Sequence, residues 1–138
     1  MPLAIVVTLE HPLPVAQTAY DKSGNGKALA RELEKLDFAA RCKSVPGLSA
    51  LLSENPTALA EQMRADGFDP AKMRLPPEQW FPAADGRKTV RALIDYVSAK
   101  LNDFKQPNPI LRDLKAADAL LTAAESAGTR FHFTKTAF

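Results

Sequence analysis

Hydrophobic residues follow two different periods along this chain, and the difference separates strands from helices. Residues 3–9 form a short apolar run, and residues 129–134 alternate between polar and apolar side chains. Both patterns are typical of β-strands, in which successive side chains point to opposite faces. We therefore predict a strand near each end of the chain, and pairing of the two strands would join the ends in one small sheet.

Between these ends, the apolar positions recur at steps of three and four, which is the spacing of one helical face. This spacing predicts amphipathic helices over residues 27–42 and 55–65. The strongest stripes cover residues 84–101 and 108–128, and their short connection predicts an αα-hairpin. The predicted fold class is α+β, mostly helical, with the terminal strands packed on these helices in a single domain over residues 1–138.

A sheet of two strands is marginally stable in water, so the predicted sheet needs a further partner. The helices could cover it, or a short extended piece at residues 15–20 could join it as a third strand. A second copy of the chain could also complete it across a two-fold axis, which predicts a homodimer.

Composition excludes several classes of protein. The chain has 138 residues, 46% of them hydrophobic and 25% charged, which are typical values for a globular domain. No apolar run is long enough to cross a membrane, and no basic segment precedes the first apolar run as in a secretory signal. The net charge of +2 is small for a nucleic-acid-binding protein. With Cys42 as the single cysteine, we expect a soluble protein of the cytoplasm.

Trp80 and Phe81 are the first candidates for a binding site, because they lie in a segment rich in proline. Aromatic side chains on a rigid backbone lose little entropy on binding and are frequent in interface hot spots. Large aromatic residues also fill small cores. Trp80 therefore either packs inward as a lid over the predicted helix hairpin or forms part of a surface that binds a partner.

Arg87, Lys88 and Arg91 place three positive charges near the start of the next predicted helix, where the helix dipole disfavours cations. An acidic partner or an anion would offset this cost, and Asp95, four residues after Arg91, is an available local partner. These basic residues are predicted either to form a solvated face or to extend the contact surface around Trp80.

The last strand offers a second kind of site. Phe131 and Phe133 are expected to face the core, whereas Arg130 and His132 are expected to face water. Together with Tyr20, these two polar residues could line a small-ligand pocket between the sheet and the helices.

No motif predicts a metal or a cofactor. The glycine-rich loop at residues 23–27 lacks the complete pattern of a phosphate-binding loop. Neither histidine has further ligands at the spacing of a zinc site, and Cys42 has no histidine near it in the sequence.

One segment carries a resemblance. Pro77-Glu78-Gln79-Trp80-Phe81, continued by Ala83-Ala84, Gly86 and Thr89-Val90-Arg91-Ala92-Leu93, together with the final Arg130-Phe131-His132-Phe133, resembles small uncharacterised bacterial proteins. The resemblance implies a bacterial, cytoplasmic protein and carries no activity with it.

Two functional hypotheses follow. The first is a non-enzymatic interaction or regulatory protein, which predicts an exposed apolar patch surrounded by charge. The second is a small-ligand-binding protein or enzyme, which predicts a closed pocket where a histidine and an arginine converge. The absence of a catalytic motif favours the first.

Overall fold

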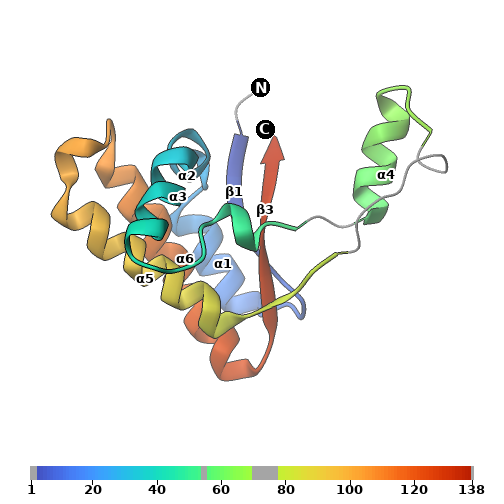
Figure 1. The fold of residues 1–138 in the computed structure, drawn as a ribbon. Helices are drawn as coiled ribbons and strands as arrows, with labels where there is room; N and C mark the ends of the chain where they lie inside the picture. Colours follow the sequence, from blue (N-terminus) through green and yellow to red (C-terminus); the bar gives the residue numbers. More distant parts are fainter. Residues whose placement is uncertain (1–2, 54–55, 70–77, 138) are drawn as a thin grey trace.

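The computed structural model describes residues 3–53, 56–69 and 78–137 (Figure 1). Three parts of the sequence-based predictions fall outside these ranges: the first residue of the helix predicted over residues 55–65, the part of the proline-rich segment at residues 70–77, and Pro77, with which the segment that carries the resemblance begins.

The two ends of the chain pair, as predicted, in one antiparallel sheet. Strand β1 (Leu3–Leu9) pairs along its whole length with β3 (Arg130–Ala137), with Val7 opposite Phe133 and Leu9 opposite Phe131. The termini therefore lie side by side in Figure 1. The short strand β2 (Phe81–Pro82) pairs with the other edge of β3, so the strand order is β1-β3-β2 and the fold is α+β.

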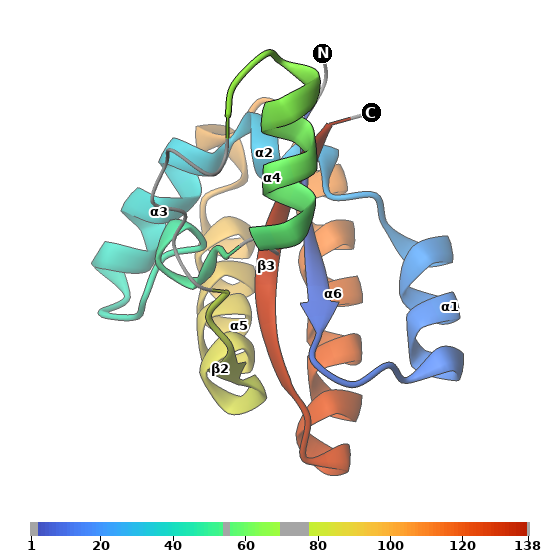
Figure 2. The ribbon, with the colours of Figure 1, turned by 90° about the vertical axis from the view of Figure 1, so that its right-hand side faces the viewer.

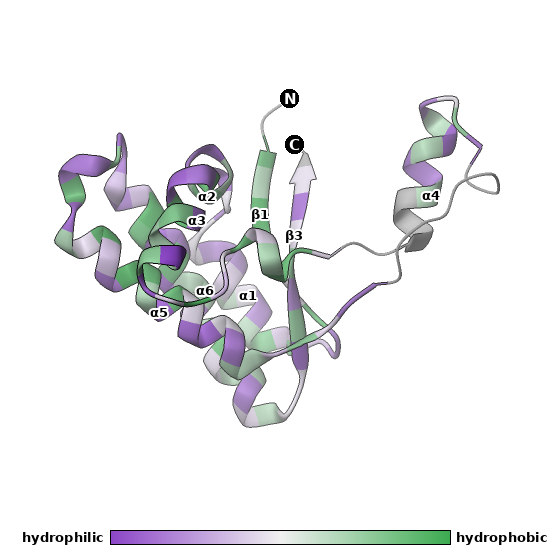
Figure 3. Cartoon of the chain, in the orientation of Figure 1, coloured by the Kyte–Doolittle hydropathy of each residue, from purple (hydrophilic) through white to green (hydrophobic). Residues whose placement is uncertain are grey.

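Helices α5 (Ala83–Ala99) and α6 (Pro107–Ala127) form the predicted αα-hairpin and pack on one face of the sheet. Phe131 and Phe133 point toward them and are fully buried. The approach is close at Gly86, where a Cβ atom would lie 2.4 Å from Cζ of Phe131. Figure 3 shows alternating hydrophobic and hydrophilic bands along both helices, which is the amphipathic pattern that buries one side of each.

The remaining elements are α1 (Pro14–Ser23), α2 (Lys27–Arg31), α3 (Leu33–Cys42), the 3-10 turns η1 (Ser49–Leu51) and η3 (Leu101–Asp103), and α4 (Pro56–Ala65). Figure 2 shows α4 in front of the sheet, on the side opposite the hairpin.

Two expectations about these elements are wrong. Residues 15–20 belong to α1, because Pro14 suits the first helical position and Tyr20 is buried on the inner side of the helix. The third strand is therefore β2 and not this segment. The helix predicted over residues 27–42 is divided at Glu32, because α2 packs along β1 whereas α3 packs against α5.

The outer edge of β1 is covered by the first two helices. The Ile5 amide donates to the Gly26 carbonyl oxygen at 2.9 Å, and the Val7 amide donates to the Tyr20 hydroxyl at 3.0 Å. An uncovered edge would offer these amides to another chain. Gly26 allows this contact because its φ is +74° and a Cβ atom there would lie 2.1 Å from the Ile5 carbonyl oxygen.

Gly26→Ala should destabilise the protein more than Gly128→Ala. Both glycines have a left-handed backbone, with φ of +74° and +72°, but a Cβ atom at Gly128 meets nothing within 4 Å. The strain of the left-handed backbone alone costs about 1–2 kcal/mol, whereas the added clash with β1 should raise the loss at Gly26 to about 3 kcal/mol or more. Urea unfolding of both variants measures the difference, and equal losses would contradict the close approach.

Candidate functional site

Trp80 and His132, which the sequence assigns to two different candidate sites, lie together on the sheet face opposite the helix hairpin. Their ring centroids are 4.5 Å apart and the rings are tilted by 43°. Trp80 is half-buried, and His132 is only 1% exposed. Trp80 therefore packs inward, but against the outer face of β3, so the expectation that it covers the helix hairpin is wrong.

The alternation of the last strand predicts that His132 faces water. The structure shows instead that His132 is buried. Its Nε2 lies 2.8 Å from the Glu78 carboxylate, and its Nδ1 lies 3.2 Å from the Thr134 hydroxyl and 3.1 Å from the Phe133 carbonyl oxygen. When Nε2 carries the proton and donates to Glu78, Nδ1 can accept from Thr134. The segment that contains Glu78 and Trp80 covers the ring, and this cover is the physical reason for its burial.

The segment around Trp80 is also fixed by hydrogen bonds of its backbone. The Gln79 amide donates to the Ser53 hydroxyl at 2.8 Å, and the Ser53 amide donates to the Phe133 carbonyl oxygen at 3.0 Å. Two loop segments that are distant in sequence thus meet on β3. Because the imidazole is enclosed and both its nitrogens have partners, it serves to hold these segments on the sheet.

The three residues predicted to line a small-ligand pocket each have a separate partner in the structure. Tyr20 lies at the outer edge of β1, and burial raises the pKa of its hydroxyl to about 12. Arg130 is exposed and donates from Nε to the Glu10 carboxylate at 3.1 Å, a bond that lowers the pKa of Glu10. His132 lies on β3, two residues after Arg130, and its ring is enclosed and bonded to Glu78.

The basic residues of α5 find their partners on α6. Arg87 forms an ion pair with Glu125, and Arg91 Nε lies 3.1 Å from the Asp118 carboxylate. Asp95 is therefore not the partner of Arg91, because the neighbouring helix offers a closer carboxylate. Lys88 is exposed and has no ion pair among the described residues. Most of the predicted positive surface is thus neutralised within the hairpin.

Phe81 is also a packed residue, in contact with the core residue Phe131. Its side chain is half-buried in β2, and its ring centroid is 6.3 Å from that of Phe131. The two aromatic residues predicted as a contact surface are therefore packed residues.

An exposed aromatic groove lies elsewhere, between α3 and the end of α5. Its volume is about 320 Å³, and it is lined by Glu34, Lys35, Phe38, Tyr96, Asp103 and Phe104. Phe38 is 53% exposed, whereas Phe104 is 6% exposed and stands edge-on to Tyr96 with a centroid distance of 6.4 Å. We name this feature the Phe38 groove. It is an apolar surface with charged residues around it.

The Phe38 groove is held in shape by a contact between its two sides. Lys35 Nζ donates to the Asp103 backbone carbonyl oxygen at 3.0 Å and lies 3.6 Å from the Glu32 carboxylate. This contact joins α3 to η3. The groove is thus built from α3, the end of α5 and the connection between α5 and α6.

Sequence reasoning missed Phe38, although the sequence contains a signal for it. The apolar stripe of the helix runs through Leu29, Leu33 and Leu36, and Phe38 follows two residues after the last of these. A shift of two residues turns by about 200° around a helix, so Phe38 lies on the polar side. A large aromatic residue in that place is unusual unless it packs on something.

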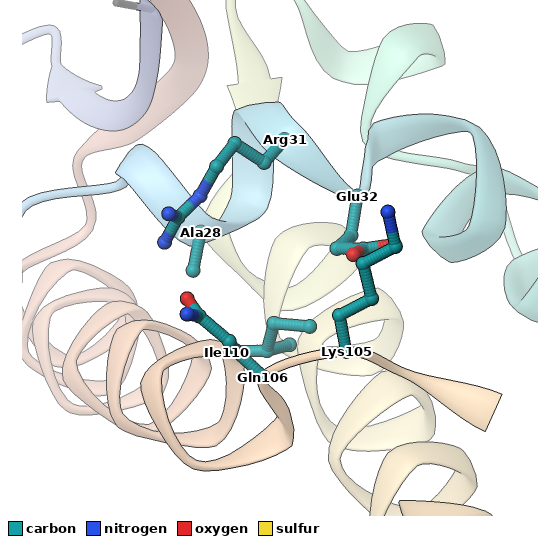
Figure 4. Close-up of a pocket in the computed structure, with 6 residues that line it drawn as sticks. All are labelled: Ala28, Arg31, Glu32, Lys105, Gln106 and Ile110. Atoms are coloured by element: carbon teal, nitrogen blue, oxygen red, sulfur yellow. The ribbon is translucent and has the colours of Figure 1, made fainter. Parts of the chain in front are cut away.

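A smaller cavity of about 150 Å³ lies between α2 and the start of α6 (Figure 4). Figure 4 shows Arg31, Ala28 and Gln106 on one side of it, Glu32 and Lys105 on the other, and Ile110 below. Charges of both signs surround this cavity, so it indicates no preferred ligand charge.

The comparisons with protein-family models, with curated proteins and with solved structures found no match to this chain. Across the described residues, no helix is both long and apolar enough to cross a membrane. Within the same residues, no three histidine, cysteine, aspartate or glutamate side chains gather as a metal site.

Trp80→Ala should destabilise the protein more than Phe38→Ala. Removing the indole exposes His132 and leaves a gap over β3, which should lower the free energy of unfolding by about 1–3 kcal/mol. Phe38 is mostly exposed, so its removal should cost less than about 1 kcal/mol. Urea unfolding of both variants tests this ranking, and the reverse order would show that Trp80 is not a packed residue.

Proposed function

We propose that this protein is a non-enzymatic interaction module that binds a partner protein through the Phe38 groove. The observation that carries the proposal is the exposure of Phe38, 53%, beside a groove of about 320 Å³ lined by two further aromatic residues. Such a surface is the exposed apolar patch surrounded by charge that the interaction hypothesis predicts.

Physical considerations support this choice of surface. Aromatic side chains contribute much of the binding energy at interfaces, and they bind best in pockets formed before the partner arrives. The Lys35–Asp103 hydrogen bond fixes the two sides of the groove, so little ordering is required on binding. Phe38 itself has few alternative conformations to lose.

The proposal keeps the functional class that the sequence favours but moves the contact surface. Trp80 and Phe81 pack against β3, and Arg87 and Arg91 pair with α6, so these residues have less to offer a partner. Lys88 is the exposed member of that set. We extend the proposal to a regulatory role in the bacterial cytoplasm, and a second copy of the chain is one partner that it allows.

Site-specific photo-crosslinking in the cells that produce the protein tests the proposal. A photoreactive phenylalanine analogue is placed at Phe38 or, as the control, at Val15 of α1, which is 87% exposed and outside the groove. We expect a discrete crosslinked species from position 38 and none from position 15. The same faint products from both positions, or no product from either, would contradict the proposed function.

A further inference from the structure

We infer that the Phe38 groove binds a basic side chain, an arginine or lysine on an apolar segment of the partner. This inference rests on the proposed function and names the chemistry of the partner. The charges that line the groove and the aromatic rings between them support this inference.

The groove carries two carboxylates without partners. Neither Glu34 nor the side chain of Asp103 forms an ion pair or a hydrogen bond with any residue in the described part of the chain. Lys35 is the cation of the lining, and its charge is already met by Glu32 and by the Asp103 carbonyl oxygen. An incoming cation would therefore find two carboxylates free to pair with it.

The aromatic rings can contribute to the same contact. Cations bind over the faces of aromatic rings. Within this protein Arg41 already lies 5.9 Å from the centroid of Phe38 and Lys100 lies 5.6 Å from the centroid of Tyr96, so a partner can use only the part of each ring that these two cations leave open. Neither of these cations lines the groove. The remaining surface of the rings can pack on the alkyl stem of a basic side chain while its charged end reaches a carboxylate.

The combination of rings and carboxylates distinguishes arginine and lysine from other occupants. A purely apolar side chain would leave Glu34 and Asp103 partly desolvated without partners, which is unfavourable. A bare metal ion would not use the rings of Phe38 and Tyr96. A long basic side chain satisfies both parts of the groove.

Fluorine NMR of protein labelled with 3-fluorotyrosine tests the inference, because the chain has only two tyrosines. Tyr96 lines the groove and reports binding, whereas Tyr20 is buried at β1 and reports that the fold is intact. The probes are a short capped peptide with one arginine between two leucines and the same peptide with citrulline, which removes the charge and keeps the shape. Tyr96→Phe assigns the two signals.

We expect the arginine peptide to shift the Tyr96 signal in a saturable manner and to bind at least about tenfold more tightly than the citrulline peptide. The double variant Glu34→Gln/Asp103→Asn should lose this preference. The matched double variant Glu61→Gln/Asp66→Asn removes the same number of carboxylates from exposed positions, one in α4 and one directly after it. This control variant should keep the preference for the arginine peptide.

Four results would overturn the inference. Equal affinity for the two peptides, or an arginine preference that survives Glu34→Gln/Asp103→Asn, would show that the carboxylates do not select a cation. Binding of neither peptide, together with a crosslink from position 38, would leave the proposed function intact and assign the groove a different partner. Binding of neither peptide without any crosslink would remove both the inference and the proposed function.

Discussion

The antiparallel pairing of β1 with β3 is the constraint on which the rest of the structure depends. It joins residues that are more than 100 positions apart, with Leu3 opposite Ala137 and Leu9 opposite Phe131, so the whole intervening chain must return to the sheet. Such pairing has a high loop-closure cost, which the burial of Ile5, Val7, Phe131 and Phe133 offsets. Strand β3 lies at the centre, with β1 on one edge and β2 on the other.

Aromatic residues pack on both faces of β3, and other aromatic residues, away from β3, line the Phe38 groove. Phe131 and Phe133 support the hairpin of α5 and α6 on one face, and His132 receives Trp80 on the other. With α5 fixed on the sheet, α3 packs beside it and the Phe38 groove forms at the end of α5, away from β3. The exposed aromatic residue is thus held by elements whose own stability does not depend on it, which suits a binding surface.

Much of the fold could be predicted because its signals are local. The stripes of α5 and α6, the alternation of β3 and the apolar run of β1 each appear within a single segment, and the structure confirms all four. Apart from residues 15–20, which form part of α1, the errors concern tertiary contacts. Alternation shows that Arg130 and His132 share a face, but the cover over His132 comes from Glu78 and Trp80, which are more than 50 positions away.

The same distinction applies to the candidate sites. Asp95 has the right local spacing for Arg91, yet the packing of α6 supplies Asp118 in its place. Phe38 was detectable as an aromatic residue off the apolar stripe, but its groove depends on Tyr96 and Phe104, which only the fold brings near it. Spacing along a chain predicts which side chains share a face of an element, and it does not predict what packs on that face.

Native-state hydrogen exchange of β1 tests most directly whether the strand is held on both edges, by β3 and by the first two helices. The Ile5 and Val7 amides point away from β3 and donate to Gly26 and Tyr20. If the first two helices enclose this edge of β1, both amides are protected from exchange with solvent. We expect both amides to exchange as slowly as the amides of Val6 and Thr8, only through global unfolding. Rapid exchange of Ile5 and Val7, or of the whole strand, would contradict the enclosure of β1 between β3 and the first two helices.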